Sequence, residues 1–376
     1  MEITIKKVLN KKMLKDFIMF PWQIYKNDPN WVAPLISDMY HRFDPVKNPY
    51  YEHADVEMFL AYREDKVVGR IVNHIDHNHN DFHKEKTAFF GFVEFIEDYE
   101  VAKALYDHSV RWTKDRKMET LRGSMSFGTN DECAFLLEGF DSPPVIMMTY
   151  NPKYYVDFTE KYGFSKSKDL LAFLKNKDDP IDPRMEKHAK RIEEDPTIIT
   201  RKFNKKNKVE EMQKVKEVYD EAWEPNWGFV PMTPKELDAT AKVLLDYADP
   251  DLVWFAEKKH EDGHIEPLGI SVIIPNLNEA LKPLNGKLGP IEIVKFISGK
   301  KKVKGLRALL FGLKKKAQGF GIPALLFMKT AEESLKKGYE WVELSWNLED
   351  NIKINTFDTS IGGKVYKKYR IYDLKT

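Results

Sequence analysis

The chain has 376 residues, of which 42% are apolar and 13% aromatic, and its 60 basic and 59 acidic residues give a net charge of +1. This length predicts two domains, and the balanced charge argues against a nucleic-acid or membrane partner. Cys133 is the only cysteine, which excludes internal disulfide bonds and indicates a reducing compartment. We expect a cytoplasmic protein, because the N-terminal residues lack the pattern of a signal peptide and no apolar run reaches the ~18 residues of a membrane span.

The first half of the chain predicts a mixed β-sheet flanked by helices. A short strand at 3–8 precedes helical patterns, and a charged turn then joins two strands at 58–62 and 67–72. Another strand follows, then a helix that begins near Val101, a strand, a short helix and a last strand. Strands joined partly by hairpins and partly by helices are typical of such a sheet.

Four histidines, His74, His77, His79 and His83, lie close together after this hairpin. At strand spacing His77 and His79 share a face and His74 lies opposite. Neither a cysteine nor a helical HExxH pattern accompanies them, so we predict a polar turn and no metal site.

A charged stretch broken by prolines predicts the domain boundary. Asp178–Pro183 and Glu193–Pro196 have the composition of a linker or connecting helix. We therefore predict an N-terminal domain at 1–177, a linker at 178–197 and a C-terminal domain at 198–376.

The order of elements recurs 200 positions later, which indicates two copies of one unit. The second copy also carries an excursion from about 275 to 304, and excursions of this length in compact domains are often functional. Three pairs of landmarks share the spacing: Gly69 and Gly269, Asn151 and Asn351, and Gly163 and Gly363.

A loop broken by glycines joins a strand at 306–313 to a helix at 323–337 in the second copy. The loop reads Gln318-Gly319-Phe320-Gly321-Ile322, and Pro323 opens the helix. Glycines let backbone N–H groups approach a phosphate, and the helix N-terminus adds partial positive charge, so this loop is a candidate pyrophosphate cradle. The apolar spacing of the helix predicts a core stripe of Ala324, Met328, Ala331 and Leu335.

This order of strand, loop, helix and strand resembles the GCN5-related N-acetyltransferase (GNAT) superfamily. The phosphate loop of that superfamily reads Gln/Arg-x-x-Gly-x-Gly/Ala and holds the pyrophosphate of acetyl-CoA. Residues 318–322 match it, Pro323 replaces the last Gly/Ala, and Asn351 ahead of Gly363 also fits. The whole chain further resembles bacterial proteins with two GNAT-like halves. The implied fold class is α/β, with two tandem acyl-CoA N-acyltransferase folds, each a mixed β-sheet flanked by helices.

The resemblance implies that acetyl-CoA or another acyl-CoA binds the C-terminal domain as co-substrate. The basic residues that flank the loop, which are Lys300–Lys302, Lys304, Arg307 and Lys314–Lys316, either attract its phosphates or form a solvated face. In the first half, the turn at 95–100 has three carboxylates and no glycine, which predicts a degenerate copy that does not bind CoA in the usual way. The implied binding residues are Leu313, Lys314, Lys315, Gln318, Gly319, Phe320, Gly321, Ile322, Asn351 and Asn355.

Glu343 and Ser345 are the first candidates for catalysis. They share a face of the predicted strand at 339–346, which in the GNAT fold splays away from the cradle strand and leaves a gap for the thioester. There Glu343 would deprotonate an acceptor amine and Ser345 would bond the leaving thiolate.

Tyr366 is the third candidate. Many family members place a tyrosine before the final glycine as a general acid, whereas this chain has Asp358 and Thr359 in that region. An aspartate ionised at neutral pH would be a poor proton donor, so Tyr366 is the candidate substitute.

We therefore expect an acyl-CoA-dependent N-acyltransferase in which a small-molecule amine or peptide attacks the thioester directly. Two alternatives stay open: a transferase that uses acyl-carrier protein or aminoacyl-tRNA as donor, and a non-catalytic acyl-CoA-binding or scaffold protein. Pro323 and the missing tyrosine favour the last, and the surviving glycines oppose it. The sequence predicts neither the acceptor, the acyl length nor the oligomeric state.

Overall fold

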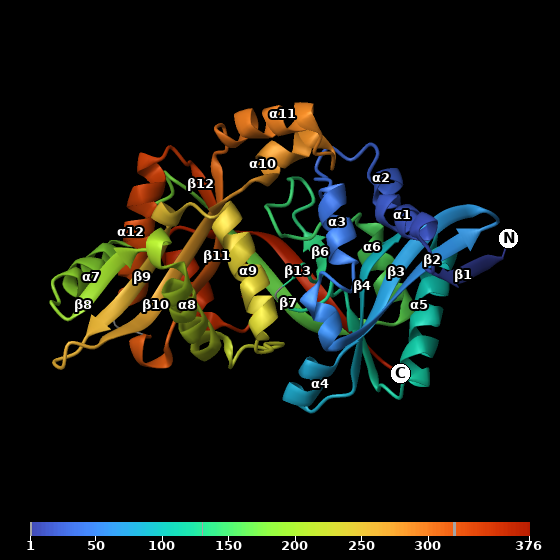
Figure 1. The fold of residues 1–376 in the computed structure, drawn as a ribbon, viewed down its shortest axis with the longest axis horizontal. Helices are drawn as coiled ribbons and strands as arrows, with labels where there is room; N and C mark the ends of the chain where they lie inside the picture. Colours follow the sequence, from blue (N-terminus) through green and yellow to red (C-terminus); the bar gives the residue numbers. More distant parts are fainter. Residues whose placement is uncertain (1, 130, 319–320) are drawn as a thin grey trace. The chain divides into compact units, whose positions relative to one another are not determined.

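The computed structural model describes residues 2–129, 131–318 and 321–376, and for 243–246 the backbone alone. The fold is mixed α/β, as predicted (Figure 1). None of the helices formed by these residues has both the length and the apolar content needed to cross a membrane.

The chain divides into two compact units. Unit 1 comprises Met1–Leu170, Ala280–Lys300 and Lys367–Thr376, and unit 2 comprises Leu171–Glu279 and Lys301–Tyr366. Two segments of the second half therefore belong to unit 1 by packing, although the division predicted from the sequence kept the second half together. Strands β7 (Ser165–Asn176) and β13 (Lys364–Lys375) each contribute residues to both units.

Unit 1 is a mixed sheet with helices on both faces. Its other elements are β1 (Ile3–Lys7), α1 (Lys11–Met19), α2 (Pro21–Ile24), α3 (Ile36–Arg42), η1 (Pro49–Glu52), β2 (Ala54–Arg63), β3 (Lys66–Asp76), α4 (His77–His83), β4 (Thr87–Phe95), α5 (Tyr99–Asp115), β5 (Thr120–Gly123), β6 (Phe135–Glu138), α6 (Tyr154–Tyr162), α10 (Asn278–Leu281, which begins in unit 2), η4 (Lys282–Leu284) and α11 (Pro290–Lys300). The strand order is β1-β2-β3-β4-β5-β13, with β4 and β5 parallel. On one face Leu105 of α5 packs with Phe90, and on the other Phe17 of α1 packs with Leu60.

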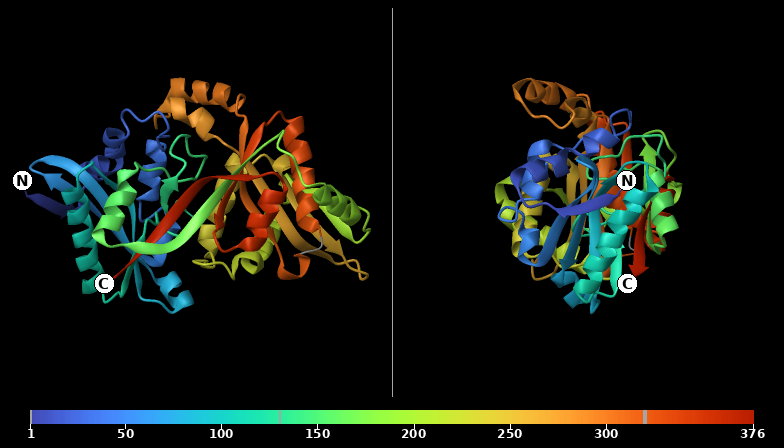
Figure 2. Two further views of the ribbon diagram at one scale, coloured as in Figure 1. Left: turned by 180° about the vertical axis from the view of Figure 1, so that it is seen from behind. Right: turned by 90° about the vertical axis from the view of Figure 1, so that its right-hand side faces the viewer.

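Unit 2 repeats this plan. Its elements are α7 (Pro183–Glu193), β8 (Ile198–Lys202), η2 (Lys205–Asn207), α8 (Lys208–Trp223), α9 (Pro234–Tyr247), η3 (Pro250–Leu252), β9 (Val253–Lys259), β10 (Ile265–Pro275), β11 (Gly305–Leu313), η5 (Lys315–Ala317), α12 (Ile322–Lys336), β12 (Trp341–Leu348) and α13 (Ile352–Ser360). The strand order is β8-β9-β10-β11-β12, with β11 and β12 parallel. Leu326 of α12 packs with Ala256 and Leu268 of the sheet, and α7 lies against α12 through Ala189 and Leu325 (Figure 2).

The register of the two hairpins confirms the repeat. Gly69 lies opposite Ala61 in β2–β3, and Gly269 lies opposite Ala256 in β9–β10. Each hairpin has a shift of register beside this glycine, and the unpaired residues, Val68 and Leu268, are also 200 positions apart. A shared β-bulge at the predicted spacing indicates a common backbone plan rather than a chance match of turn residues.

The histidine region is a helix, so the strand-based prediction of its faces was wrong. Asp76 accepts a hydrogen bond from the backbone N–H of His79, which starts α4 at His77. His74 remains on β3, where its ring bonds the Tyr50 hydroxyl at 2.8 Å and the carbonyl of Met125 at 3.1 Å. Among the described residues, no three His, Cys, Asp or Glu side chains are placed to hold a metal ion.

The predicted core stripe of α12 was wrong at its end. Leu335 is 53% exposed, whereas Thr330 and Ser334 are buried. Their hydroxyls donate to the carbonyls of Leu326 and Thr330, each at 2.7 Å, so these small polar side chains are buried without unsatisfied groups. Apolar spacing alone does not detect this arrangement.

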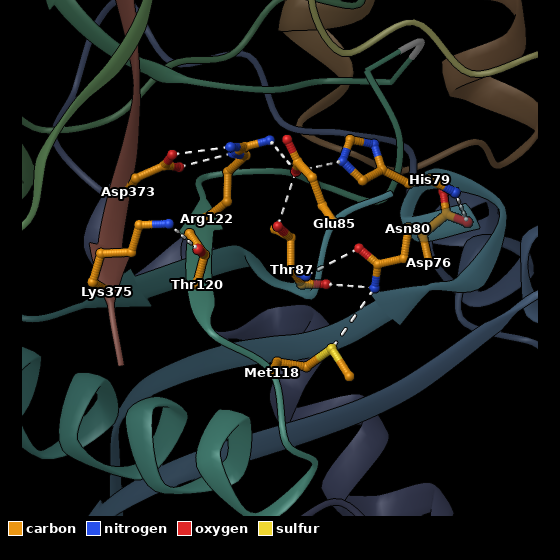
Figure 3. Close-up of polar contacts among 10 residues, drawn as sticks. All are labelled: Asp76, His79, Asn80, Glu85, Thr87, Met118, Thr120, Arg122, Asp373 and Lys375. Atoms are coloured by element: carbon orange, nitrogen blue, oxygen red, sulfur yellow. Dashed lines mark hydrogen bonds and ion pairs between the residues drawn. The ribbon is translucent and has the colours of Figure 1, made fainter. Parts of the chain in front are cut away.

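An ion-pair network in unit 1 holds the C-terminal strand β13 against β5. Arg122 donates two hydrogen bonds to Asp373, at 2.8 and 3.0 Å, and one to Glu85 at 3.2 Å. Glu85 also accepts a bond from Thr87 and lies 3.3 Å from Nε2 of His79 (Figure 3). Burial lowers the pKa of His79 to about 4, so the ring is neutral near pH 7 and adds no charge to the network.

We expect Arg122→Ala to lower the free energy of unfolding by about 2–4 kcal/mol, because it leaves the carboxylates of Asp373 and Glu85 without their buried cation. Arg122→Lys restores only part of this, since lysine cannot make the two-pronged contact. Urea unfolding followed by circular dichroism measures the change. Lys86→Ala removes the exposed pair with Glu119 and serves as control, with no measurable change expected. Equal stability of the Arg122→Ala and Lys86→Ala proteins would contradict the prediction.

Candidate active site

The candidate site in unit 2 lies where β11 and β12 part. The two strands pair in parallel over only four positions, from Gly305 with Trp341 to Ala308 with Leu344. Beyond this point β11 continues beside β10 to Leu313 and shifts its register at Val272 and Ile273 of β10. The splay expected between the cradle strand and the following strand is therefore confirmed.

Three candidate catalytic side chains meet beside this parting. The Ser345 hydroxyl donates to Oε1 of Glu343, and the Tyr366 hydroxyl donates to Oε2 of the same carboxylate. Glu343 is fully buried and Ser345 is buried, while Tyr366 is partly exposed. The sequence pointed to each residue separately, and the structure brings them into one hydrogen-bonded cluster.

Arg307, expected among the basic residues that flank the cradle, lies in the part of β11 that pairs with β12. It is buried and is the register partner of Glu343 in the β11–β12 pair. Because paired residues of neighbouring strands project to the same face, its guanidinium lies on the face that carries the Glu343 carboxylate. The useful signal in the sequence is an arginine inside the otherwise apolar strand at 306–313.

Asp358 also differs from the expectation. It is buried on α13, and Nδ2 of Asn347 donates to its Oδ2 at 2.7 Å. Burial raises the pKa of Asp358 to about 7, against a smaller opposing effect of the Asn347 hydrogen bond. Asp358 is therefore only partly ionised near pH 7, which differs from the full ionisation expected of an ordinary aspartate.

The glycine loop leads into an open helix N-terminus. Gly321 has φ of +82°, a left-handed conformation that glycine readily adopts, and it is the N-cap of α12. Among the described residues, no side chain caps this helix, and its first turn carries no acidic residue. Ile322 is buried in the core, so only its backbone can face a ligand. Gly319 and Phe320, also predicted to bind, lie outside the described residues.

Gly321 also lies against α7, within the predicted linker. A Cβ atom at Gly321 would lie 3.0 Å from Cγ1 of Ile192 and 3.1 Å from the carbonyl oxygen of His188. A larger residue at this position therefore perturbs packing as well as any phosphate contact.

The lysines beside the loop are paired with carboxylates. Lys314 is buried and donates to Glu217 and, at 3.4 Å, to Glu266, which also accepts from Lys316. The hydrogen bond from Lys316 is the main reason that the pKa of Glu266 falls to about 2. Lys315 is exposed, and its backbone N–H donates to Glu221 at 3.1 Å. Much of the positive charge of this cluster is thus compensated within the protein.

The remaining predicted binding residues have structural contacts. Leu313 points its side chain into the core, and its carbonyl accepts a 3.4 Å hydrogen bond from Gln318. Lys353 donates to the Gln318 amide oxygen at 3.0 Å. Asn351 caps α13, and Asn355 donates to the carbonyl of Leu348 at 3.0 Å. Oδ1 of Asn355 is buried and has no partner among the described residues.

Unit 1 lacks the open helix N-terminus. The side chain of Asp98 caps α5 by accepting from the N–H of Glu100. Glu94 at the end of β4 is partly buried, and it accepts hydrogen bonds from Tyr25 at 2.9 Å and Tyr155 at 2.7 Å. Burial raises the pKa of Glu94, and the approach of Arg70 at 3.7 Å opposes that shift. Carboxylates therefore occupy the region that corresponds to the phosphate end of the unit 2 site.

We expect the pH dependence of stability to reveal Asp358. Asp358 keeps its proton up to about pH 7 in the folded state and loses it near pH 4 in the unfolded state. Its contribution to the free energy of unfolding is therefore complete at low pH and is lost as the pH rises. Relative to Asp358→Asn, wild-type protein should lose up to about 4 kcal/mol of unfolding free energy between about pH 4 and pH 8.

Urea unfolding at a series of pH values measures this difference. The control is Asp157→Asn, an exposed residue on the corresponding helix α6, which should follow the wild-type profile. Parallel pH profiles for wild type and Asp358→Asn would show that Asp358 titrates as an ordinary carboxyl group.

Comparison with known proteins places the chain in a family. No family model matches it. It is 33% identical over 378 residues to protein YghO of Escherichia coli, covering 98% of this chain and 94% of that protein. It is 32% identical over 380 residues to the bacterial ceramide synthase of Caulobacter vibrioides, covering 99% of this chain and 97% of that protein.

Solved structures agree on the fold. A tandem GNAT protein from the clavulanic acid biosynthesis pathway matches with a TM-score of 0.56 and 12% identity, covering 100% of this chain and 98% of that one. A GCN5-related N-acetyltransferase from Sphaerobacter thermophilus matches with a TM-score of 0.55 and 11% identity, covering 99% and 95%. The chain therefore belongs to the family of YghO and the bacterial ceramide synthase, and it has the tandem GNAT fold.

Proposed function

We propose that this protein is an N-acyltransferase that moves a long acyl chain from acyl-CoA to the amine of a long-chain amino alcohol. The observation that carries the proposal is the cluster of Tyr366, Glu343 and Ser345 beside the parting of β11 and β12. A buried carboxylate with two hydroxyls bonded to it suits proton removal from an amine.

The donor fits the unit 2 site better than the corresponding region of unit 1. Among the described strands, none pairs with this edge of β11 beyond Ala308, and a pantetheine arm carries amides that can bond to such an edge. Strands β4 and β5 of unit 1 part after Phe90 in the same way, so the two units differ at the helix that follows. The uncapped N-terminus of α12 attracts phosphate through its N–H groups and dipole. Because Lys314 and Lys316 are paired with Glu266, this attraction depends on the helix more than on the lysines.

The proposed chemistry assigns the two proton movements to separate groups. Acyl-CoA supplies a thioester; a carbon–nitrogen bond forms, the carbon–sulfur bond breaks, the amine loses one proton and the sulfur gains one. Ser345 and Tyr366 direct their protons to Glu343, so their oxygens can accept N–H bonds from the amine while Glu343 takes the proton. Asp358, whose pKa burial raises to about 7, is the candidate donor of the proton to sulfur.

The acceptor class comes from the relative named bacterial ceramide synthase. A ceramide is a fatty amide of a long-chain amino alcohol, so its synthesis by acyl transfer forms an amide bond. The likeness to that protein covers 99% of this chain, and both GNAT-like halves are therefore included. We extend the same reaction class to this chain.

We expect Glu343→Gln to lower kcat by about 10²–10⁴ with a much smaller change in KM, because the amide keeps the shape but cannot take the amine proton. The assay follows amide formation by mass spectrometry, with palmitoyl-CoA as donor and sphinganine as acceptor. Glu94→Gln in unit 1 is the control, a partly buried carboxyl with two tyrosine partners, and should retain kcat. Full activity of Glu343→Gln would refute the assignment of the base, and absence of product with every acyl-CoA and amine tested would leave a binding protein.

We also expect Gln318→Glu to weaken acyl-CoA binding by about tenfold or more, because it adds a nearly isosteric negative charge to the candidate phosphate loop ahead of α12. Calorimetric titration measures the affinity without requiring turnover. This change is preferable to Gly321→Glu, which would also collide with Ile192 and the His188 backbone. Glu97→Gln at the corresponding loop of unit 1 is the control and should leave the affinity unchanged. If Gln318→Glu bound acyl-CoA as tightly as wild type, the phosphate site would lie elsewhere.

A further inference from the structure

Helix α11 is fixed to unit 1 through the segment ahead of it. The backbone N–H of Ile36 donates to the carbonyl of Gly286 at 2.9 Å, and the Trp22 indole donates to Oδ1 of Asn285 at 3.0 Å. Gly286 has φ of +78°, and a Cβ atom there would lie 2.5 Å from the Trp22 ring. A larger residue at position 286 would collide with Trp22. The segment that precedes α11 is therefore held in one position against unit 1.

The outward face of α11 is apolar, the reverse of an ordinary surface helix. None of its residues is buried, and Ile291 and Val294 are 67% and 68% exposed. Ile297 is also more than half exposed, and these three residues recur every third position, so they form one stripe along the helix. The opposite side packs inward, since a Cβ atom at Gly299 would lie only 3.2 Å from Cβ of Ala280. An unpartnered stripe of large aliphatic side chains usually marks a binding surface.

Positive charge surrounds this stripe. At 100° per residue, Lys295 and Lys300 fall on its two margins, and both are exposed. Of the acidic residues in 278–302, Glu279 is occupied in accepting the backbone N–H groups of Lys304 and Gly305, each at 2.9 Å. Glu292 is the other acidic residue, and it lies on the inward side. The segment 278–302 has six lysines: Lys282, Lys287, Lys295, Lys300, Lys301 and Lys302.

We propose that α11 is an interfacial helix that binds the surface of an anionic lipid bilayer. Ile291, Val294 and Ile297 enter the boundary between headgroups and acyl chains, and Lys295 and Lys300 pair with anionic headgroups on either side. The charged residues on these margins are lysines, which complement an anionic surface. The proposal goes beyond the proposed function and is tested without turnover, so failure of one does not decide the other.

This assignment departs from the expectation of no membrane partner, which followed from the net charge. The net charge of +1 averages over the whole chain, whereas membrane attraction acts over about a Debye length and depends on the local excess of lysines. The excursion at 275–304 was predicted to be functional, and in this proposal its function is to bind the membrane. An enzyme whose donor and acceptor both carry long chains would meet them at such a surface.

The test is co-sedimentation of the full chain with vesicles of phosphatidylcholine mixed with phosphatidylglycerol, compared with vesicles of phosphatidylcholine alone. We expect binding to the anionic vesicles that weakens as salt is added. The double variant Val294→Asp/Ile297→Asp should bind at least about tenfold more weakly, because it places charge in the apolar stripe. The control Leu9→Asp/Val209→Asp changes two residues that are each 77% exposed elsewhere and should bind as wild type does.

A second variant keeps the test decisive if the first folds poorly. Lys295→Glu/Lys300→Glu retains the stripe but should lose the preference for anionic vesicles. Circular dichroism and the urea midpoint establish that each variant is folded. The proposal is overturned if wild-type protein does not sediment with anionic vesicles, or if both α11 variants sediment as wild type does. It is also overturned if wild type self-associates without lipid and Val294→Asp/Ile297→Asp abolishes that association, which would assign the stripe to a second copy of the chain.

Discussion

The candidate site depends on one constraint: β11 and β12 stop pairing after Ala308 and Leu344. Up to that point the two strands satisfy each other's backbone groups in the ordinary way. Beyond it, the described strands pair with β11 on the β10 side only, so the N–H and C=O groups along its other edge need another partner. Glu343 is paired with Arg307 just before this point, and Ser345 follows directly after it. The position of the candidate site therefore follows from where this one strand pair ends.

The two units share one arrangement of strands and helices but differ in how the crossover helix begins. Both units have the hairpin with its bulge, the short parallel pair and the crossover helix. In unit 1 the crossover helix is capped by Asp98, and Tyr25 and Tyr155 bond Glu94 at the end of β4. In unit 2 the corresponding helix starts at Gly321 with no side-chain cap among the described residues. The two copies therefore differ at the start of the crossover helix, whereas a carboxylate with two hydroxyl partners is present in both.

In our proposals, substrates with long chains account for two separate features of the molecule. The site in unit 2 joins an acyl group to an amine in our proposal, and α11 in unit 1 presents aliphatic side chains to its surroundings with lysines at their margins. Exposed isoleucine and valine are unfavourable in water, and they persist here on a helix that Trp22 and Ile36 support through its preceding loop. A lipid surface removes that cost and supplies the opposite charge.

The sequence by itself determined the repeat, the position of the glycine loop and the alternation that puts Glu343 and Ser345 on one strand face. These features are local or periodic, so spacing and residue type are sufficient to predict them. Only the tertiary structure decided that Lys314 and Lys316 are paired with Glu266, that Asp358 has a pKa of about 7, and that 280–300 and 367–376 belong to unit 1. Each of these depends on groups distant in the sequence, because burial and charge pairing are set by what packs nearby and not by what precedes in the chain.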